Sequence, residues 1–297
     1  MTSFEMIKYH GQEYPAGVPL RIEEIAAHFD IAKVGGRLDR SLHTEYSYGK
    51  RKWDSALVQK YTELFAAQKD SVPQLWKNER WAEQFADFIF ELNGDGPEPK
   101  VIEIHPPFSD YTDIAGFVRS YSAFEAKIKD RFLEVDILVE NRCGSVSHGG
   151  KFVVSKVRDI DALCEAIAEA GIQLKVAYDV PQIYTAHNAK TDNAKTDNAK
   201  TEDEYIRLLE ESKRFRGTIG GVHLWGKSIS STGRKVSHCG DLNSYFGDQA
   251  IKGHFLNAFK DCFDDGIVRK MVLEVNSGNA DLQSIVADLR SVGICFV

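Results

Sequence analysis

Four short apolar runs decide the fold of this chain: DILVEN (136–141), LKVAYD (174–179), GGVHLW (220–225) and KMVLEVN (270–276). Between and after them lie longer stretches with apolar residues at three-to-four spacing, such as Leu282, Ile285, Val286 and Leu289. The short β-branched runs are typical of buried strands, and the longer spacing is typical of amphipathic helices. Strands that alternate with helices predict a parallel sheet with right-handed crossovers.

The alternation continues toward the N-terminus, where its elements are less distinct. We expect a strand at KVIEIH (100–105) and three more at Phe4–Tyr9, Phe29–Val34 and Val72–Trp76, with a helix over Ile22–His28. Eight strands suffice to close a (β/α)8 TIM barrel, and about 250 residues routinely form one such domain. The sequence therefore predicts a single barrel domain over residues 1–297, with a doubly wound open sheet as the alternative.

Residues 188–201 interrupt this pattern with the tandem repeat NAKTD NAKTD NAKT. Small and polar residues of this kind cannot bury a core. Because the repeat follows the LKVAYD strand, we expect a flexible insertion at the barrel mouth that has no role in function.

The composition excludes several classes of protein. No run of about 18 apolar residues is present, so a membrane-spanning helix is not expected, and the N-terminus does not have the pattern of a secretory signal. The five cysteines are scattered and form no CxxC pair, which is typical of reduced thiols in a cytoplasmic protein. The net charge of -7 gives no general affinity for nucleic acid, although it leaves room for a local basic patch.

Ionisable residues near the ends of the four apolar runs are the strongest functional signal. They are Glu140, Asp179, His223 and Glu274. A charged or imidazole side chain inside a buried strand is costly unless it is paired or bound to a cation. On parallel strands, these four would converge at the C-terminal mouth, where barrel enzymes hold their active sites. Three carboxylates and one imidazole suit Mn²⁺, Mg²⁺, Co²⁺ or Zn²⁺, whereas private salt bridges to nearby helices are the alternative.

Two further histidines lie at or shortly after predicted strands and are also candidate functional residues. His105 ends the VIEIH strand, and His238 lies in the segment GRKVSHCGDL shortly after the His223 strand. Each fits a metal ligand, an acid–base group or a structural histidine. The stretch 221–228, GVHLWGKS, also matches a phosphate-binding loop, but its middle is itself a strand and no helix pattern follows, which argues against nucleotide binding.

These motifs resemble the superfamily of xylose-isomerase-like barrels, which comprises sugar isomerases and epimerases and the endonuclease IV type of DNA-repair enzyme. The resemblance covers residues 100–297, and more weakly the N-terminal third. It implies that the central metal is held by Glu140 in VENR, Asp179 in AYDV, His223 in VHLW and Glu274 in VLEV. The HPPF sequence at His105 resembles the family's strand end, and the segment with Arg234, His238 and GDL (240–242) resembles its loop.

The sequence departs from the endonuclease branch, whose members bind three zinc ions with additional ligands. The predicted third strand, VPQLW (72–76), contains no histidine. Gln182 stands three residues after the aspartate, where that branch has histidine, and Val236 stands two before the loop histidine, where it has aspartate. The resemblance therefore implies one divalent ion per chain.

From this resemblance we expect a metal-dependent isomerase or epimerase that acts on a small sugar, polyol or cyclitol through an enediolate. Glu140 and Glu274 would transfer the proton, with His105 as a further catalytic group. Substrate hydroxyls or a phosphate would be held by Gln182, Arg234 and His238. Endonuclease-like cleavage of abasic DNA, and a metal-binding barrel without catalysis, are the alternatives.

Overall fold

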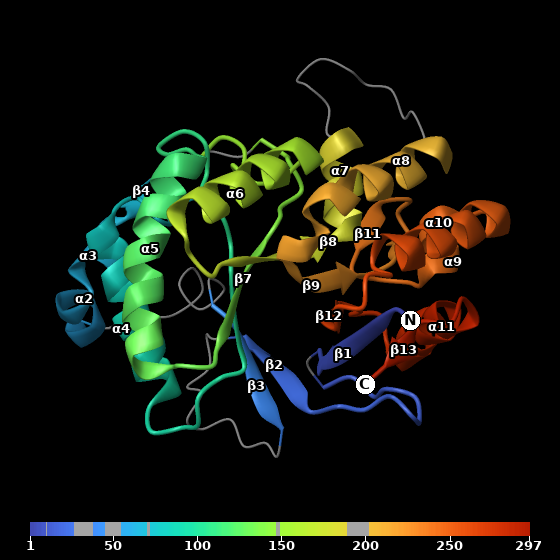
Figure 1. Ribbon diagram of the computed structural model, residues 1–297, viewed down its shortest axis with the longest axis horizontal. Helices are drawn as coiled ribbons and strands as arrows, with labels where there is room; N and C mark the ends of the chain where they lie inside the picture. Colours follow the sequence, from blue (N-terminus) through green and yellow to red (C-terminus); the bar gives the residue numbers. More distant parts are fainter. Residues whose placement is uncertain (10, 27–37, 45–54, 70–71, 147–148, 189–201) are drawn as a thin grey trace.

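Eight parallel strands close into a barrel in the computed structural model, which describes residues 1–9, 11–26, 38–44, 55–69, 72–146, 149–188 and 202–297. The strands, in order around the barrel, are β1 (Ser3–Lys8), β2 (Ile22–Ala26), β3 (Asp39–His43), β6 (Val101–Ile104), β7 (Asp136–Glu140), β8 (Lys175–Asp179), β9 (Ile219–Leu224) and β12 (Arg269–Leu273). Pairing of β12 with β1 closes the ring. The predicted (β/α)8 barrel is confirmed (Figure 1).

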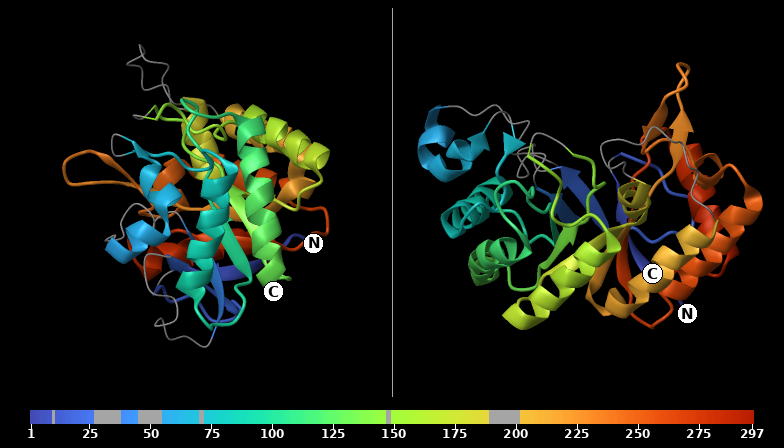
Figure 2. Two further views of the ribbon diagram at one scale, coloured as in Figure 1. Left: turned by 90° about the vertical axis from the view of Figure 1, so that its left-hand side faces the viewer. Right: turned by 90° about the horizontal axis from the view of Figure 1, so that it is seen from above.

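Helices surround the barrel on its outside, as the view from above shows (Figure 2). They are α2 (Ser55–Lys60), α3 (Thr62–Ala66), α4 (Glu79–Asn93), α5 (Ile114–Arg131), α6 (Val157–Ala170), α7 (Val180–Asn188), α8 (Glu202–Ser212), α9 (Leu242–Phe246), α10 (Gln249–Cys262) and α11 (Asn279–Ser291), with the 3-10 helix η2 (Lys213–Thr218). Minor strands are β4 (Gln68–Lys69) with β5 (Val72–Pro73), the hairpin of β10 (Lys227–Ile229) and β11 (Lys235–Ser237), and β13 (Cys295–Phe296) beside β1. None of the described helices has the length and apolar character needed to cross a bilayer.

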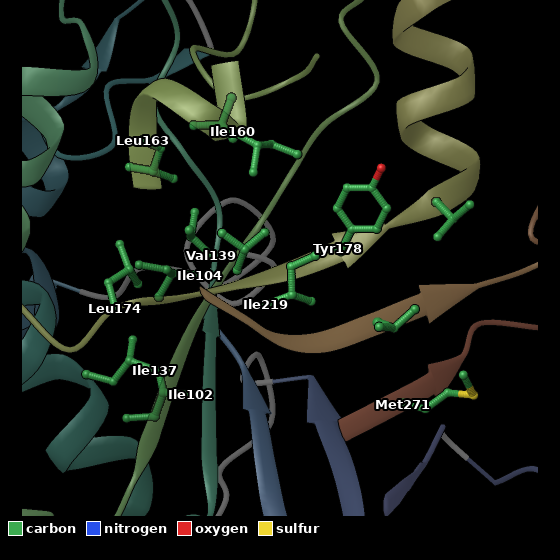
Figure 3. Packing of buried hydrophobic residues seen from close by; sticks show 14 of the residues in the cluster. Ile102, Ile104, Ile137, Val139, Ile160, Leu163, Leu174, Tyr178, Ile219 and Met271 are labelled. Carbon is green, nitrogen blue, oxygen red and sulfur yellow. The ribbon is translucent and has the colours of Figure 1, made fainter. Parts of the chain in front are cut away.

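The main core lies between the strands and the surrounding helices. Figure 3 shows Ile104 and Val139 on the side of their strands that carries Ile160 and Leu163 of α6. Successive side chains in a strand point to opposite faces, so the residues between these apolar ones face the barrel interior. The apolar core therefore determines which residues of each strand point inward.

Inside the barrel, apolar residues form a floor below a layer of charged residues. We call the set Ile7, Ile22, Val101, Leu138, Ala177 and Val272 the floor layer, since these buried residues form a separate apolar cluster. Two residues further along five of these strands come Glu24, Glu103, Glu140, Asp179 and Glu274, all buried. The period of two in a strand places each acidic residue on the same inner face as the floor residue that precedes it.

The structure of the N-terminal third corrects two sequence predictions. Ile22–Ala26 is strand β2, so the helix predicted over Ile22–His28 is wrong. Ile22 and Ile25 are three residues apart with two glutamates between them, a spacing that is also typical of a helix. The strand predicted at Val72–Trp76 is also wrong, because β5 spans only Val72–Pro73 and pairs with β4 outside the barrel. The third barrel strand is instead β3, DRSLH. It begins with polar residues, so it lacks the apolar run by which a buried strand is recognised in the sequence. The strand predicted at 29–34 lies outside the described residues, as do residues 189–201 of the repeat.

We expect Gly221→Ala to destabilise the protein by about 1–3 kcal/mol, the usual cost of overpacking a core. A Cβ at Gly221 would lie 2.9 Å from Leu138 Cδ1, and Leu138 belongs to the packed floor layer. The matched control is Gly253→Ala in α10, where nothing lies within 4 Å of the added carbon. That change should be neutral or stabilise the helix by up to about 1 kcal/mol. Urea unfolding measures both, and equal effects of the two variants would contradict the packing described.

Candidate metal centre

The four predicted ligands all lie at the C-terminal end of the barrel. Glu140 and Asp179 are the last residues of β7 and β8, His223 is in β9, and Glu274 directly follows β12. All four are buried. Ligand atoms of Asp179, His223 and Glu274 lie within 4.8 Å of one another, which is close enough for a single ion.

A second group of possible ligands lies beside the first and includes a residue that was not predicted. His43, at the end of β3, has its Nε2 atom 2.9 Å from His105 Nε2, and His105 Nε2 is 2.8 Å from Glu140 Oε2. The ligand atoms of these three residues also lie within 4.8 Å of one another. The third barrel strand therefore does carry a histidine, and the contrary prediction is wrong. Recognition of 39–43 as a strand would have revealed it.

Neighbouring polar groups hold the two carboxylates at the ends of β7 and β8. Gln182 donates hydrogen bonds from its side-chain amide to Glu140 and, at 3.0 Å, to Asp179 Oδ2. Trp225 Nε1 donates to the same Asp179 oxygen at 2.9 Å. Asn141 exchanges two hydrogen bonds with the Asp179 backbone, at 2.9 and 3.0 Å, which joins the ends of the two strands. Gln182 thus contacts two ligands, and its predicted contact with substrate stays a prediction.

The other predicted residues differ in their distance from this centre. His238 Nδ1 lies 3.1 Å from Glu274 Oε2, and its ring stacks on Trp225 with centroids 4.2 Å apart. Arg234 lies in the turn between β10 and β11, where it is exposed and its side chain makes no hydrogen bond or ion pair within the described parts of the chain. Its predicted role in substrate binding stays a prediction. Arg142, which was not predicted, donates from Nη1 to Glu140 Oε1 at 2.8 Å.

Several buried atoms of the centre fit a bound cation. His223 Nδ1, His238 Nδ1 and Glu274 Oε2 are buried and make no hydrogen bond of good geometry among the described residues, although His238 Nδ1 lies 3.1 Å from Glu274 Oε2. His223 Nδ1 nevertheless lies 3.3 Å from Glu274 Oε1. A buried polar atom without a partner costs about 1–3 kcal/mol, and a divalent ion between nitrogen and oxygen atoms removes that cost. The donor set of imidazoles and carboxylates suits Zn²⁺, Mn²⁺ or Co²⁺.

Protons on two histidines neutralise the carboxylates when no metal is bound. Burial lowers the pKa of His43, but the hydrogen bond to Glu24 and the charge of Glu103 outweigh it and raise this pKa to about 10. Burial likewise opposes the charges of Glu103 and Glu274 at His223, and these charges raise its pKa well above the usual value. A cation that binds here must therefore displace protons.

Two other groups have pKa values shifted in opposite directions. Burial, with the charges of Glu140 and Glu274, raises the pKa of Asp179 to about 7. Burial and the positive charge of Arg142 lower the pKa of His105 to about 3, so its imidazole is neutral at physiological pH. Neutral imidazole is the form that binds metals.

No protein-family model matches this sequence, and neither does any curated protein. Similar solved structures include a xylose isomerase domain protein from Alicyclobacillus acidocaldarius subsp. acidocaldarius, with 13% identity, a TM-score of 0.49 and coverage of 98% of both chains. Another is a xylose isomerase domain containing protein from Salmonella typhimurium LT2, with 13% identity and a TM-score of 0.45, over 92% of this chain and 88% of that chain. A third is SacUVDE, also with 13% identity and a TM-score of 0.45, over 92% and 81% of the two chains.

Two of these three proteins are xylose isomerase domain proteins. The pairing of the chain's own strands, closed by β12 with β1, establishes the barrel.

We expect the affinity for Mn²⁺ to increase as the pH rises from about 6 to about 8. Below its pKa of about 7, Asp179 holds a proton that competes with the metal, and His43 holds one throughout this range. For each proton that the metal displaces, the affinity rises by up to about tenfold per pH unit. Calorimetric titration in two buffers of different ionisation enthalpy measures both the affinity and the protons released. A pH-independent affinity without proton release would contradict this picture of the centre.

Proposed function

We propose that this protein is a metal-dependent enzyme whose centre holds two divalent ions and hydrolyses a phosphate ester. The observation that carries the proposal is the second ligand group, His43, His105 and Glu140, beside the group formed by Asp179, His223 and Glu274. The prediction of a single ion rests partly on a third strand without histidine. The third barrel strand, β3, ends in His43, so this part of the reasoning no longer holds. When bound, paired divalent ions supply Lewis-acid stabilisation of the phosphoryl oxygens and lower the pKa of bound water.

The residues around the ligands would preorganise the centre and bind the substrate. Gln182 and Arg142 fix the carboxylate of Glu140, so its position is set before any substrate arrives. Groups fixed in advance stabilise developing charge without reorganisation during the reaction. His238 is about one-third exposed and contacts Glu274. We assign to it the exchange of a proton with the substrate, since imidazole is the commonest acid–base group near neutral pH.

Isomerisation or epimerisation of a sugar or polyol, as predicted from the sequence, is the second candidate function. It is favoured by the presence of two carboxylates, Glu140 and Glu274, in one buried site with Asp179. In this function one ion suffices, and the two glutamates carry the proton to and from carbon. The number of bound ions and the need for His43 therefore distinguish the two candidates.

The decisive experiment compares His43→Ala with His254→Ala, a change at a histidine that is exposed on α10. We expect wild type with Mn²⁺ or Zn²⁺ to hydrolyse bis(4-nitrophenyl) phosphate or to nick duplex DNA at an abasic site. His43→Ala should lose one ion per chain by elemental analysis and slow hydrolysis by about 10²-fold or more, since a catalytic ion contributes several kcal/mol. His254→Ala should match wild type.

The second candidate gives a different result. Wild type would then introduce solvent deuterium into carbon-bound positions of a ketose pool in D₂O. Glu274→Gln would abolish this exchange at saturating metal, a loss of about 10²–10⁴-fold, because an amide cannot carry the proton. His43→Ala would retain it. Metal binding with neither reaction would point to a barrel that binds metal without catalysis.

A further inference from the structure

Two buried glutamates, Glu24 on β2 and Glu103 on β6, lie next to the candidate ligands but belong to neither group of the proposed pair of sites. Glu103 Oε2 lies 3.1 Å from His223 Nε2, and Glu24 Oε1 lies 3.5 Å from His43 Nδ1. Both carboxylates are at most 5% exposed. A buried charge is retained only where a partner compensates for lost hydration, so each glutamate needs its histidine.

The geometry of His223 shows which of its nitrogen atoms is available to an ion. Its Nε2 atom is at hydrogen-bond distance from Glu103, whereas its Nδ1 atom is buried without a hydrogen-bond partner in the described part of the chain. The Nδ1 atom lies 3.3 Å from Oε1 of Glu274, a member of the same ligand group. The neutral imidazole that binds an ion has one N–H and one lone pair, so in that form the proton belongs on Nε2, against Glu103, and the lone pair on Nδ1.

His43 has the same arrangement with its two nitrogen atoms exchanged. Its Nε2 atom faces the other ligands, His105 at 2.9 Å and Glu140 Oε2 at 3.6 Å. Its Nδ1 atom faces Glu24. In the neutral form that binds an ion, the proton therefore belongs on Nδ1, and the lone pair on Nε2 points toward the second group.

We propose that Glu24 and Glu103 are positioning residues of the metal centre, each accepting a hydrogen bond from the ring nitrogen of a ligand histidine that faces away from the ion. Glu24 fixes the tautomer and ring orientation of His43, and Glu103 those of His223. The proposal rests on the metal centre of the proposed function and adds that each half of the centre has its own carboxylate support. Loss of such partners typically weakens metal binding 10–100-fold.

Glu103 contacts His223 from the opposite side of the barrel. Its strand, β6, is separated from the His223 strand, β9, by β7 and β8 in the sheet, so the contact spans the barrel interior. Glu103 could serve instead as a direct ligand, since its oxygen lies within 4.8 Å of ligand atoms of Glu140 and His223. In that arrangement His223 would bind the metal through Nε2, and its Nδ1 atom would face Glu274 with no metal between them. The two roles predict different behaviour in a double variant.

The experiment uses Co²⁺ as the probe and the full chain. Competition with a chromophoric chelator gives the affinities, visible absorption reports the Co²⁺ coordination, and His43→Ala and His223→Ala assign the binding steps. We expect Glu103→Gln to weaken the step lost in His223→Ala by about 10–100-fold, and Glu24→Gln to weaken the other step by a similar factor. Glu5→Gln is the matched control: Glu5 lies in strand β1 and contacts Lys270 instead of a ligand. Its affinities should stay within about twofold of wild type, the scatter expected of a change away from the site.

The double variant separates positioning from direct ligation. If Glu103 acts only through His223, then Glu103→Gln has no further effect on affinity in the His223→Ala background. An undiminished effect there would make Glu103 a ligand and overturn the positioning role. Wild-type affinities in both single glutamate variants, with only a lower melting temperature of the metal-free protein, would make the glutamates structural and overturn the inference alone. A wild-type protein that binds no Co²⁺ would overturn the proposed function and this inference together.

Discussion

Burial of carboxylates inside a closed barrel is the constraint on which the rest of the site depends. Glu24, Glu103, Glu140, Asp179 and Glu274 are all buried, and Arg142 is the arginine that contacts this group. So much negative charge at low dielectric is tolerated only with compensating cations or protons. The raised pKa values of His43 and His223 show that protons serve in the metal-free protein. A divalent ion supplies the same compensation with two charges at one point.

The strand register determines where this charge collects. Val101, Leu138, Ala177 and Val272 belong to the floor layer, and an acidic residue follows each of them two positions later. Parallel pairing aligns the neighbours: Asp179 pairs with His223, and His43 pairs with Glu103. Because the side-chain period is two, a shift of one residue would turn the acidic side chain toward the helices. The apolar floor and the outer core therefore hold the ligands in one layer.

Among the possible ligand groups, the two that the proposed function uses share a common design. In each, a strand-end histidine presents one nitrogen to other candidate ligands and the second to a buried glutamate. Glu140, fixed by Gln182 and Arg142, belongs to the group of His43 and His105, with its Oε2 2.8 Å from His105, and Gln182 links it to Asp179 of the other group. The two ions of the proposed function would lie on either side of Glu140, and two ions a few ångströms apart are typical of enzymes that hydrolyse phosphate esters.

The sequence by itself determined the alternation of strands and helices over residues 100–297, and with it the barrel and the positions of Glu140, Asp179, His223 and Glu274. Those positions follow from local patterns, because an ionisable residue at the end of an apolar run can be recognised in the sequence itself. The sequence did not reveal β3 or His43, since DRSLH has no apolar run and becomes a barrel strand through its pairing with β2 and β6. Only the tertiary structure decided that Glu24 and Glu103 contact histidines. Their partner histidines lie 19 and 120 residues away along the chain, brought together by barrel closure.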